Sequence, residues 1–349
     1  MLNIFLDTQV YHSKNFNFQD KDFLRMEKFI DDEMIKLYTT PITKNEIENH
    51  IKQKIEDSRE YINTFKENAK ILLNYDLYRP IWDRKTIKQA EIKLLEDFHN
   101  FLIENNVEEI PISGDATKQI FQNYFEGEAP FSSKKKDEFP DAFALYSLLN
   151  WAENNEEIIH VVSGDNDLKN FCESKENILH IESLENALDI INQHDEVRYR
   201  FAQRLYDDQL AEFVEYINDS IRDGSAELNI DAYDVLDVEL KEFFVEGEDD
   251  LSADPLFLDL EENRLTIALN VVFNIHIITS VIDPTRSPYD SEEGKYLYVE
   301  YEENEYMDVI RIPVELELDV EDYENQYYTI ESITINNGQV YYYTILEDC

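Results

Sequence analysis

The first apolar segment of the chain reads Leu2-Asn3-Ile4-Phe5-Leu6-Asp7-Thr8, a short strand pattern that ends in an acid. A later segment, His160-Val161-Val162-Ser163-Gly164-Asp165-Asn166-Asp167, again places acids directly after β-branched residues. Open α/β sheets bind ligands at the carboxyl ends of their strands. If the intervening helices wind both strands into one parallel sheet, Asp7 and Asp165 are expected to meet at that edge.

Strand and helix patterns alternate through the first half of the chain. Strands are expected at residues 2–7, 37–43, 107–112, 157–163 and 178–181. Helices are expected at residues 22–37, from about 46 to 74, and at 84–105, 116–125, 140–151 and 184–191. Such alternation predicts an α/β domain in which helices cover both faces of a central parallel sheet.

The second half of the chain has a different pattern. One amphipathic helix is expected from Arg200 to Ile221, and the residues after Gly224 are rich in strands. The run Ile312-Pro313-Val314-Glu315-Leu316-Glu317-Leu318-Asp319-Val320 alternates apolar and mostly acidic residues, which is typical of an antiparallel sheet with one wet, acidic face. Asn336-Asn337-Gly338 predicts a hairpin turn. We therefore expect an α/β domain over residues 1–195 and an α+β domain, dominated by antiparallel strands, over residues 196–349.

Composition excludes several classes of protein. The chain has 349 residues and 43% hydrophobic residues, which favours a globular protein of two domains. No segment approaches the roughly 18–20 apolar residues that span a bilayer, and the N-terminus lacks a basic leader pattern, so a cytoplasmic protein is expected. Two cysteines give no disulfide framework, the histidines lack zinc-ligand spacing, and no phosphate-binding glycine loop or nucleophile elbow is present.

The net charge of −46 is the most unusual feature of the composition. Residues 1–195 carry 22 basic and 38 acidic residues, and the remainder carries 9 basic and 39 acidic residues. This charge opposes general affinity for nucleic acids, because no overall basic surface is available to release counterions. Nucleic-acid binding would therefore require a local site. Solubility, or adaptation to a salty cytoplasm, is the plainer interpretation of the charge.

Five acids stand at or near the ends of expected elements: Asp7, Glu46, Asp141, Asp165 and Asp167. A cluster of carboxylates is costly unless a divalent cation neutralises it. Hard oxygen ligands favour Mg²⁺ or Mn²⁺, and two such ions can support hydrolysis of a phosphodiester. We assign the bridging position to Asp7. The sequence thus predicts a metal-dependent nuclease.

Each acid also has a plainer interpretation. Asp141 is a suitable charge for the first turn of a helix. Glu46 stands three residues after Thr43, in the pattern of a capping box. Asp165-Asn166-Asp167 is typical of a turn that caps a helix. About one residue in five is acidic in this chain, so the prediction depends on placement rather than on residue type.

Four segments together resemble the successive motifs of the PIN-domain family, over roughly residues 1–192. They are the strand that ends at Asp7, Thr43-Lys44-Asn45-Glu46-Ile47, Asp141-Ala142-Phe143-Ala144-Leu145, and Val162-Ser163-Gly164-Asp165-Asn166-Asp167-Leu168. The resemblance implies a three-layer α/β/α fold and an Mg²⁺- or Mn²⁺-dependent nuclease that acts mostly on single-stranded RNA. It implies metal ligands at Asp7, Glu46, Asp141 and Asp165, with Asp167 as an auxiliary acid.

The chain departs from the compact, toxin-type members of that family in one segment. The segment from residue 47 to residue 105 is much longer than its counterpart in those members, so a helical insertion is expected beside the cleft. In this respect the chain is closer to larger bacterial PIN-like proteins with an appended domain. Lys134, Lys135 and Lys136 are candidates for guiding phosphate to the metals, and a solvated loop is the alternative. Lys85 and Lys88, on the insertion, are second candidates.

The leading hypothesis is an endoribonuclease that cleaves single-stranded RNA, and family analogy suggests bacterial defence or toxin action as its context. The alternatives are a non-cleaving PIN-like binding or regulatory module, and a nuclease for single-stranded or branched DNA. The acidic, tyrosine-rich C-terminal region is a candidate surface for a protein partner, or an internal competitor for the cleft. Core and edge aromatics are the plainer interpretation of its tyrosines, which are Tyr296, Tyr298, Tyr301, Tyr306, Tyr327, Tyr328, Tyr341, Tyr342 and Tyr343.

Overall fold

The computed structural model divides the chain into two compact units, Met1–Ile191 and Asn192–Cys349. It describes residues 1–131, 139–232, 237–261, 263–283, 285–290, 295–322 and 327–345. The division falls four residues before the expected boundary at 195/196. Each unit has its own sheet and its own core, and the two are described separately below.

The first unit is built on a five-stranded sheet in the order β3-β2-β1-β4-β5, in which every neighbouring pair is parallel. The chain runs outward from β1 to β3 and then returns to place β4 on the other side of β1. Ligand crevices in open sheets form at such a switch in strand order. The strands are β1 (Leu2–Leu6), β2 (Ile35–Thr39), β3 (Glu108–Glu109), β4 (Ile159–Val162) and β5 (Ile178–Ile181).

Helices connect these strands and give the α/β/α layers that the sequence predicts. The apolar residues of β1 and β4 are almost fully buried, as expected for strands covered on both faces. The helices are α1 (Thr8–Ser13), α2 (Lys21–Asp31), α3 (Pro41–Asn68), α4 (Arg79–Trp82), α5 (Arg84–Glu104), α6 (Thr117–Glu126), α7 (Phe139–Asn155), α8 (Asn166–Glu173) and α9 (Leu184–Asn192).

Two element boundaries near β2 differ from the expectation. The helix expected over residues 22–37 ends at Asp31, because Glu33 takes a positive φ of 55° and the chain then enters β2. The strand expected over residues 37–43 ends at Thr39. Proline is favoured in the first turn of a helix, and Pro41 follows Thr40, which is the N-cap of α3. The pattern of apolar residues alone did not reveal where this helix or this strand ends.

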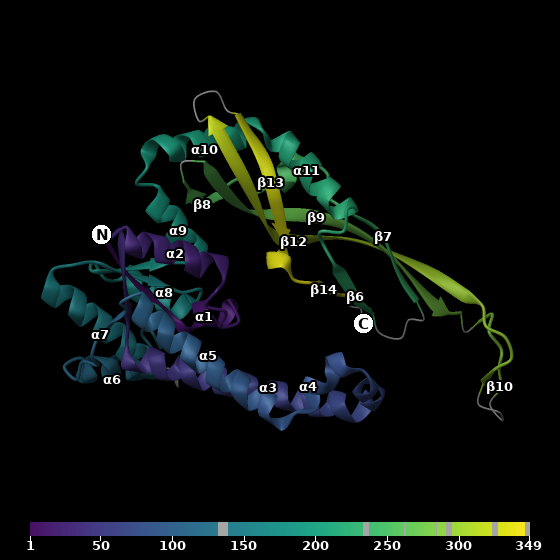
Figure 1. Ribbon diagram of the computed structural model, residues 1–349, viewed down its shortest axis with the longest axis horizontal. Coiled ribbons are helices and arrows are strands. Elements are labelled where there is room, and N and C mark those ends of the chain that lie inside the picture. Colours follow the sequence, from purple (N-terminus) through teal and green to yellow (C-terminus); the bar gives the residue numbers. More distant parts are fainter. Residues whose placement is uncertain are drawn as a thin grey trace. The chain divides into compact units, whose positions relative to one another are not determined.

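The expected insertion at residues 47–105 consists mostly of α3 and α5, which lie side by side and extend away from the sheet (Figure 1). We call residues 50–93 the helical arm. At its far end are α4 and two short 3₁₀ turns, η1 (Lys70–Asn74) and η2 (Asp76–Tyr78). The rings of Phe65 and Trp82 pack with centroids 5.9 Å apart, but Tyr61 remains 78% exposed. The arm therefore presents apolar and aromatic side chains to solvent.

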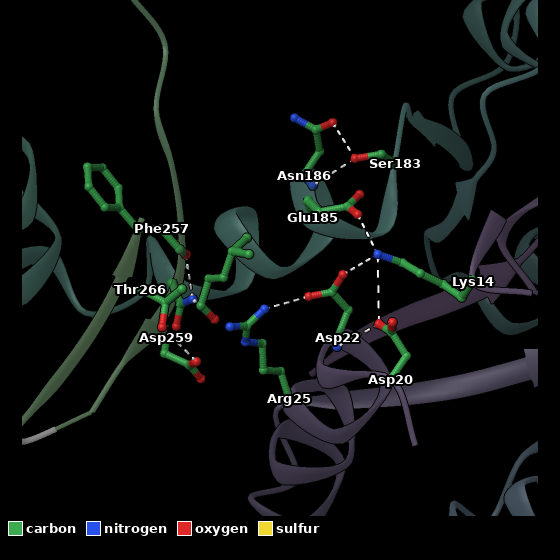
Figure 2. A network of polar contacts seen from close by, with 12 residues as sticks. Lys14, Asp20, Asp22, Arg25, Ser183, Glu185, Asn186, Phe257, Asp259 and Thr266 are labelled. Atoms are coloured by element: carbon green, nitrogen blue, oxygen red, sulfur yellow. Dashed lines mark hydrogen bonds and ion pairs between the residues drawn. The ribbon is translucent and has the colours of Figure 1, made fainter. Parts of the chain in front are cut away.

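A buried ion network joins α2 and α9 to Lys14, the C-cap of α1 (Figure 2). The Lys14 ammonium pairs with Asp22 and, at 2.7 Å, with Glu185, while Arg25 pairs with Asp22 at 2.6 Å. Burial alone would lower the pKa of Lys14, but the two carboxylates outweigh it and raise the pKa. The charges are thus compensated, and the network fixes α1 against two neighbouring helices.

The second unit is an antiparallel sheet whose apolar face is covered by two helices. Its four main strands lie in the order β13-β12-β9-β7, and β8 also pairs with β9. The elements are α10 (Glu196–Asp208), α11 (Leu210–Arg222), β6 (Leu228–Ala232), β7 (Asp237–Phe244), β8 (Leu256–Leu260), β9 (Arg264–Ile282), β12 (Tyr301–Asp322), β13 (Tyr327–Ile335) and β14 (Tyr341–Ile345), with a short pair β10 (Tyr289–Asp290) and β11 (Lys295–Tyr296).

The alternation predicted for residues 312–320 is confirmed. Even-numbered residues from Ile310 to Val320 are buried against α10 and α11, and the odd-numbered ones face outward. Two expectations are wrong. The single helix expected over 200–221 is broken at Gln209, and Asn336-Asn337-Gly338 forms a 3₁₀ turn rather than a hairpin turn, because β14 leaves the sheet and pairs in parallel with β6.

The tyrosines of this unit divide between packing and exposure. Tyr306, Tyr328, Tyr341 and Tyr343 pack against the core, whereas Tyr298, Tyr301, Tyr327 and Tyr342 are exposed. Among the helices in the described ranges, none combines the length and the apolar character needed to cross a membrane.

Candidate functional site

Asp7 occupies the position directly after β1, at the switch in strand order. Its backbone N–H donates to the carbonyl of Val162 at 3.0 Å, which fixes it beside the end of β4. Its carboxylate is the N-cap of α1 and accepts from the Thr8 N–H at 2.8 Å. The start of the helix therefore holds the acid in a defined orientation.

Ser163 links the ends of β1 and β4 through a single hydroxyl. Its Oγ donates to Asp7 Oδ2 at 2.8 Å and accepts from the Asp165 N–H at 3.0 Å. The residue is fully buried. A Cβ on the next residue, Gly164, would lie 3.3 Å from Oε1 of Gln9 in α1, so glycine leaves room for that side chain.

Asp165 is the N-cap of α8, and its Oδ1 accepts from the Asp167 N–H at 2.6 Å. The capping interpretation of this segment is therefore correct. It does not remove Asp165 from the site, because the capping places its carboxylate at the end of β4, next to that of Asp7. The charge of Asp165 acts directly on Asp7.

Glu46 reaches the same region from the end of β2. Its Oε2 accepts from the Thr8 hydroxyl at 3.2 Å. The predicted capping box of Thr43 and Glu46 is wrong: Thr40 is the N-cap and accepts from the Thr43 N–H at 3.2 Å. Glu46 consequently lies in the second turn of α3, where no backbone cap requires it.

Burial and mutual repulsion both act on these carboxylates. Burial raises the pKa of Asp7, the charge of Asp165 raises it further, and hydrogen bonds from Ser163 and the backbone partly oppose the rise. Burial likewise raises the pKa of Glu46, and the charge of Asp7 adds to it, while the Thr8 hydroxyl and His50 oppose it. Asp165 thus disfavours the charged form of Asp7, and Asp7 disfavours the charged form of Glu46.

The remaining predicted ligand, Asp141, and the predicted auxiliary acid, Asp167, each lie in the first turn of a helix. Asp141 is half-buried in the first turn of α7, and Asp167 is half-buried in the first turn of α8. Pro140 and Phe143, on either side of Asp141, line a cavity that Glu46 also lines. The predicted phosphate guides, Lys134, Lys135 and Lys136, lie outside the described residues.

The donor set suits a divalent cation by its chemistry. Asp7, Glu46 and Asp165 offer carboxylate oxygens, the ligands that Mg²⁺ and Mn²⁺ prefer, and a cation would offset the burial and the repulsion that raise the pKa values of Asp7 and Glu46. In their present rotamers, however, no three His, Cys, Asp or Glu side chains of the described ranges are grouped closely enough to hold one ion. Both oxygens of Asp7 already accept hydrogen bonds.

Residues 4–168 match the family model of the PIN domain. The matched range spans the four motif segments, and the match agrees with the α/β/α architecture of the first unit. The N-terminal unit of this chain therefore belongs to the PIN-domain family. PIN domains are generally nucleases, and they typically use divalent metal ions. Comparisons with curated proteins and with solved structures gave no match.

Two residues of the site were not identified from the sequence as participants. Thr8 and Ser163 carry no charge, and the sequence patterns assign neither of them a role. Only their positions could have indicated a role. Thr8 directly follows Asp7, and Ser163 lies between the end of β4 and Asp165. In the structure the Ser163 hydroxyl connects Asp7 to Asp165, and Thr8 donates to Asp7 through its N–H and to Glu46 through its hydroxyl.

Proposed function

We propose that this chain is a metal-dependent endoribonuclease that hydrolyses single-stranded RNA. The observation that supports it most is the convergence of Asp7, Glu46 and Asp165 from the ends of three neighbouring strands, with raised pKa values at Asp7 and Glu46. Repulsion of this kind is retained in a folded protein when a cation compensates it in the working state.

In this proposal Asp7, Glu46, Asp141 and Asp165 hold Mg²⁺ or Mn²⁺, and Asp167 assists. The bound ions would supply an activated water and charge compensation at the leaving oxygen. The protein's own contribution is orientation. Ser163 and the Thr8 N–H fix the two oxygens of Asp7, and the Thr8 hydroxyl fixes Glu46.

The helical arm supports the proposal because it reverses the charge of the chain locally. Residues 50–93 hold 10 basic and 7 acidic residues, in a protein whose net charge is −46. Lys54, Lys66, Lys70, Lys85 and Lys88 form no ion pair with any residue in the described ranges. Exposed aromatic residues such as Tyr61 and Tyr75 lie on the same arm. Basic side chains interspersed with aromatics suit single-stranded nucleic acid.

Cleavage of labelled single-stranded RNA in Mn²⁺, with and without a chelator, tests the proposal. We expect cleavage by the wild type, no cleavage in chelator, and loss of cleavage in Asp141→Asn with little change in unfolding temperature. Asp115→Asn, which removes an exposed acid of the same unit, is the matched control and should cleave normally. Full activity of Asp141→Asn would rule out its assignment, and single-stranded and branched DNA substrates decide the choice of nucleic acid.

A non-cleaving binding or regulatory module is the second candidate. The observation that favours it is the absence of a ready three-ligand group within the described ranges. Such a module would bind RNA in the same assay without cutting it. A role in bacterial defence or toxin action, and a protein partner for the exposed tyrosines of the second unit, extend the main proposal.

A further inference from the structure

A cavity of about 430 Å³ adjoins the carboxylates. Its walls come from the first three turns of α3 and from the start of α7, together with Ile112. The volume lies within the roughly 300–1,000 Å³ that is usual for small-molecule sites. No residue role described so far uses this space.

The lining of the cavity is mainly apolar and partly rigid. Pro41, Ile42, Pro140 and Phe143 supply apolar surface. Phe139 belongs to an aromatic cluster, with its ring centroid 4.8 Å from Tyr124, 5.1 Å from Phe131 and 5.4 Å from Phe121. One wall is therefore held in place before any ligand arrives, which lowers the entropic cost of binding.

Two amides stand at the polar side of the cavity, next to Glu46. Asn45 donates through Nδ2 to the Pro41 carbonyl at 2.6 Å, which leaves its Oδ1 as an acceptor. The Asn49 side chain makes no hydrogen bond to any residue of the described ranges, and it is exposed. Amides can both donate and accept, so they suit the edge of a heterocyclic base.

Glu46 belongs both to this cavity and to the group of carboxylates, where the Thr8 hydroxyl holds it. A phosphodiester positioned at the carboxylates must carry its neighbouring nucleotide past Glu46. The phosphate itself is a poor occupant of the cavity, because it would meet apolar walls and the negative charge of Glu46. A base, which is flat and weakly charged, gains from the same walls.

We propose that this cavity binds one unpaired base of the substrate, next to the scissile phosphate. The base packs against Phe143 and Pro41, and Asn45 and Asn49 contact its edge. The inference rests on the proposed nuclease function and adds to it a site that selects unpaired bases. Base–aromatic contacts contribute about 1–3 kcal/mol each, which corresponds to roughly 5- to 150-fold in affinity.

Single-stranded RNA oligonucleotides with one abasic position, moved stepwise along the strand, test this site. Binding is measured in chelator by fluorescence anisotropy, so the result does not depend on cleavage. We expect one abasic position to weaken binding by about 5- to 150-fold. In Phe143→Ala the intact and abasic strands should bind alike. Phe143→Leu, which retains most of the wall's volume, should reproduce that loss of discrimination in a folded protein.

Phe125→Ala is the matched control, because Phe125 is 79% exposed and lies outside the cavity. This variant should bind intact RNA more tightly than abasic RNA by the same factor as the wild type. Equal binding of intact and abasic strands by the wild type would overturn the base site, even if cleavage in Mn²⁺ is intact. Base discrimination without cleavage would instead refute the nuclease and keep the site. If Phe143→Ala changed the oligomeric state, the cavity would hold a second copy and the proposal would be wrong.

Discussion

Replacing Ser163 with alanine is expected to destabilise the first unit and to weaken the group of acids at the same time. The Ser163 hydroxyl makes two hydrogen bonds, one to the Asp7 carboxylate at 2.8 Å and one from the Asp165 N–H at 3.0 Å. A hydrogen bond to a charged group contributes about 1.5–3 kcal/mol and a neutral one about 1 kcal/mol. The residue is fully buried, so water does not replace either bond without rearrangement.

The expected cost is therefore about 2.5–4 kcal/mol of unfolding free energy. For a unit of this size, each kcal/mol lowers the unfolding temperature by roughly 2–4 °C, so a loss of about 5–16 °C is expected by calorimetry. Ser147→Ala is the matched control. Ser147 is equally buried and also makes two hydrogen bonds, to the Phe143 carbonyl and from the Ser113 N–H, but neither involves a charge. Its cost should be about 2 kcal/mol.

The two variants should also differ in their dependence on pH. The Ser163 hydrogen bond lowers the pKa of Asp7, so its loss raises that pKa further above the ordinary value of 3.8. An acid whose pKa is raised in the folded state binds more protons there, and stability falls as pH rises through the shifted range. The cost of Ser163→Ala should grow as the pH rises above 3.8 and through the raised pKa of Asp7, while that of Ser147→Ala stays constant. Equal, pH-independent costs would refute this reasoning.

Three further outcomes are expected. Lys14→Met should lower the free energy of unfolding by about 3 kcal/mol, which lowers the unfolding temperature by roughly 6–12 °C. It removes one partner from a buried ion network in which Arg25 still compensates Asp22. A shift below about 2 °C would show that the network contributes little to stability. Glu46→Gln should raise the unfolding temperature in chelator, since the glutamine oxygen still accepts from the Thr8 hydroxyl and the repulsion by Asp7 is removed, and a lowered temperature would contradict the repulsion. The double variant Lys85→Glu, Lys88→Glu should weaken RNA binding and reduce the slope of log affinity against log salt concentration by about 0.7 per lost phosphate contact. The control Lys118→Glu, on α6, should change neither quantity. Identical slopes for the two variants would exclude the arm from RNA binding.

The sequence was sufficient for the architecture of the first unit because the apolar strands and the helices alternate clearly. The run around Leu2–Leu6 and that around Ile159–Val162 are short, continuous and followed by acids, and the structure pairs them directly. The start of α3 was not resolved by the same reasoning. A capping box at Thr43 and an N-cap at Thr40 are both compatible with the local residues, and only the position of Pro41 favours the second.

Long-range pairing and uncharged hydrogen-bonding groups were beyond the reach of sequence patterns. Asn336-Asn337-Gly338 has the composition of a hairpin turn, but β14 pairs in parallel with β6, more than 100 residues earlier in the chain. Thr8 and Ser163 are ordinary residues in sequence, and they become part of the site only because β1, β2 and β4 are neighbours. The acids were identifiable because charge at the end of a buried strand needs a partner.

The most direct test of the central claim is an anomalous-scattering map from a crystal soaked in Mn²⁺. If Asp7, Glu46 and Asp165 share a divalent cation, a strong peak will lie between their carboxylates, and Asp7→Asn will reduce or remove it. Strong peaks at other acidic surfaces, with none between these three side chains, would contradict the account.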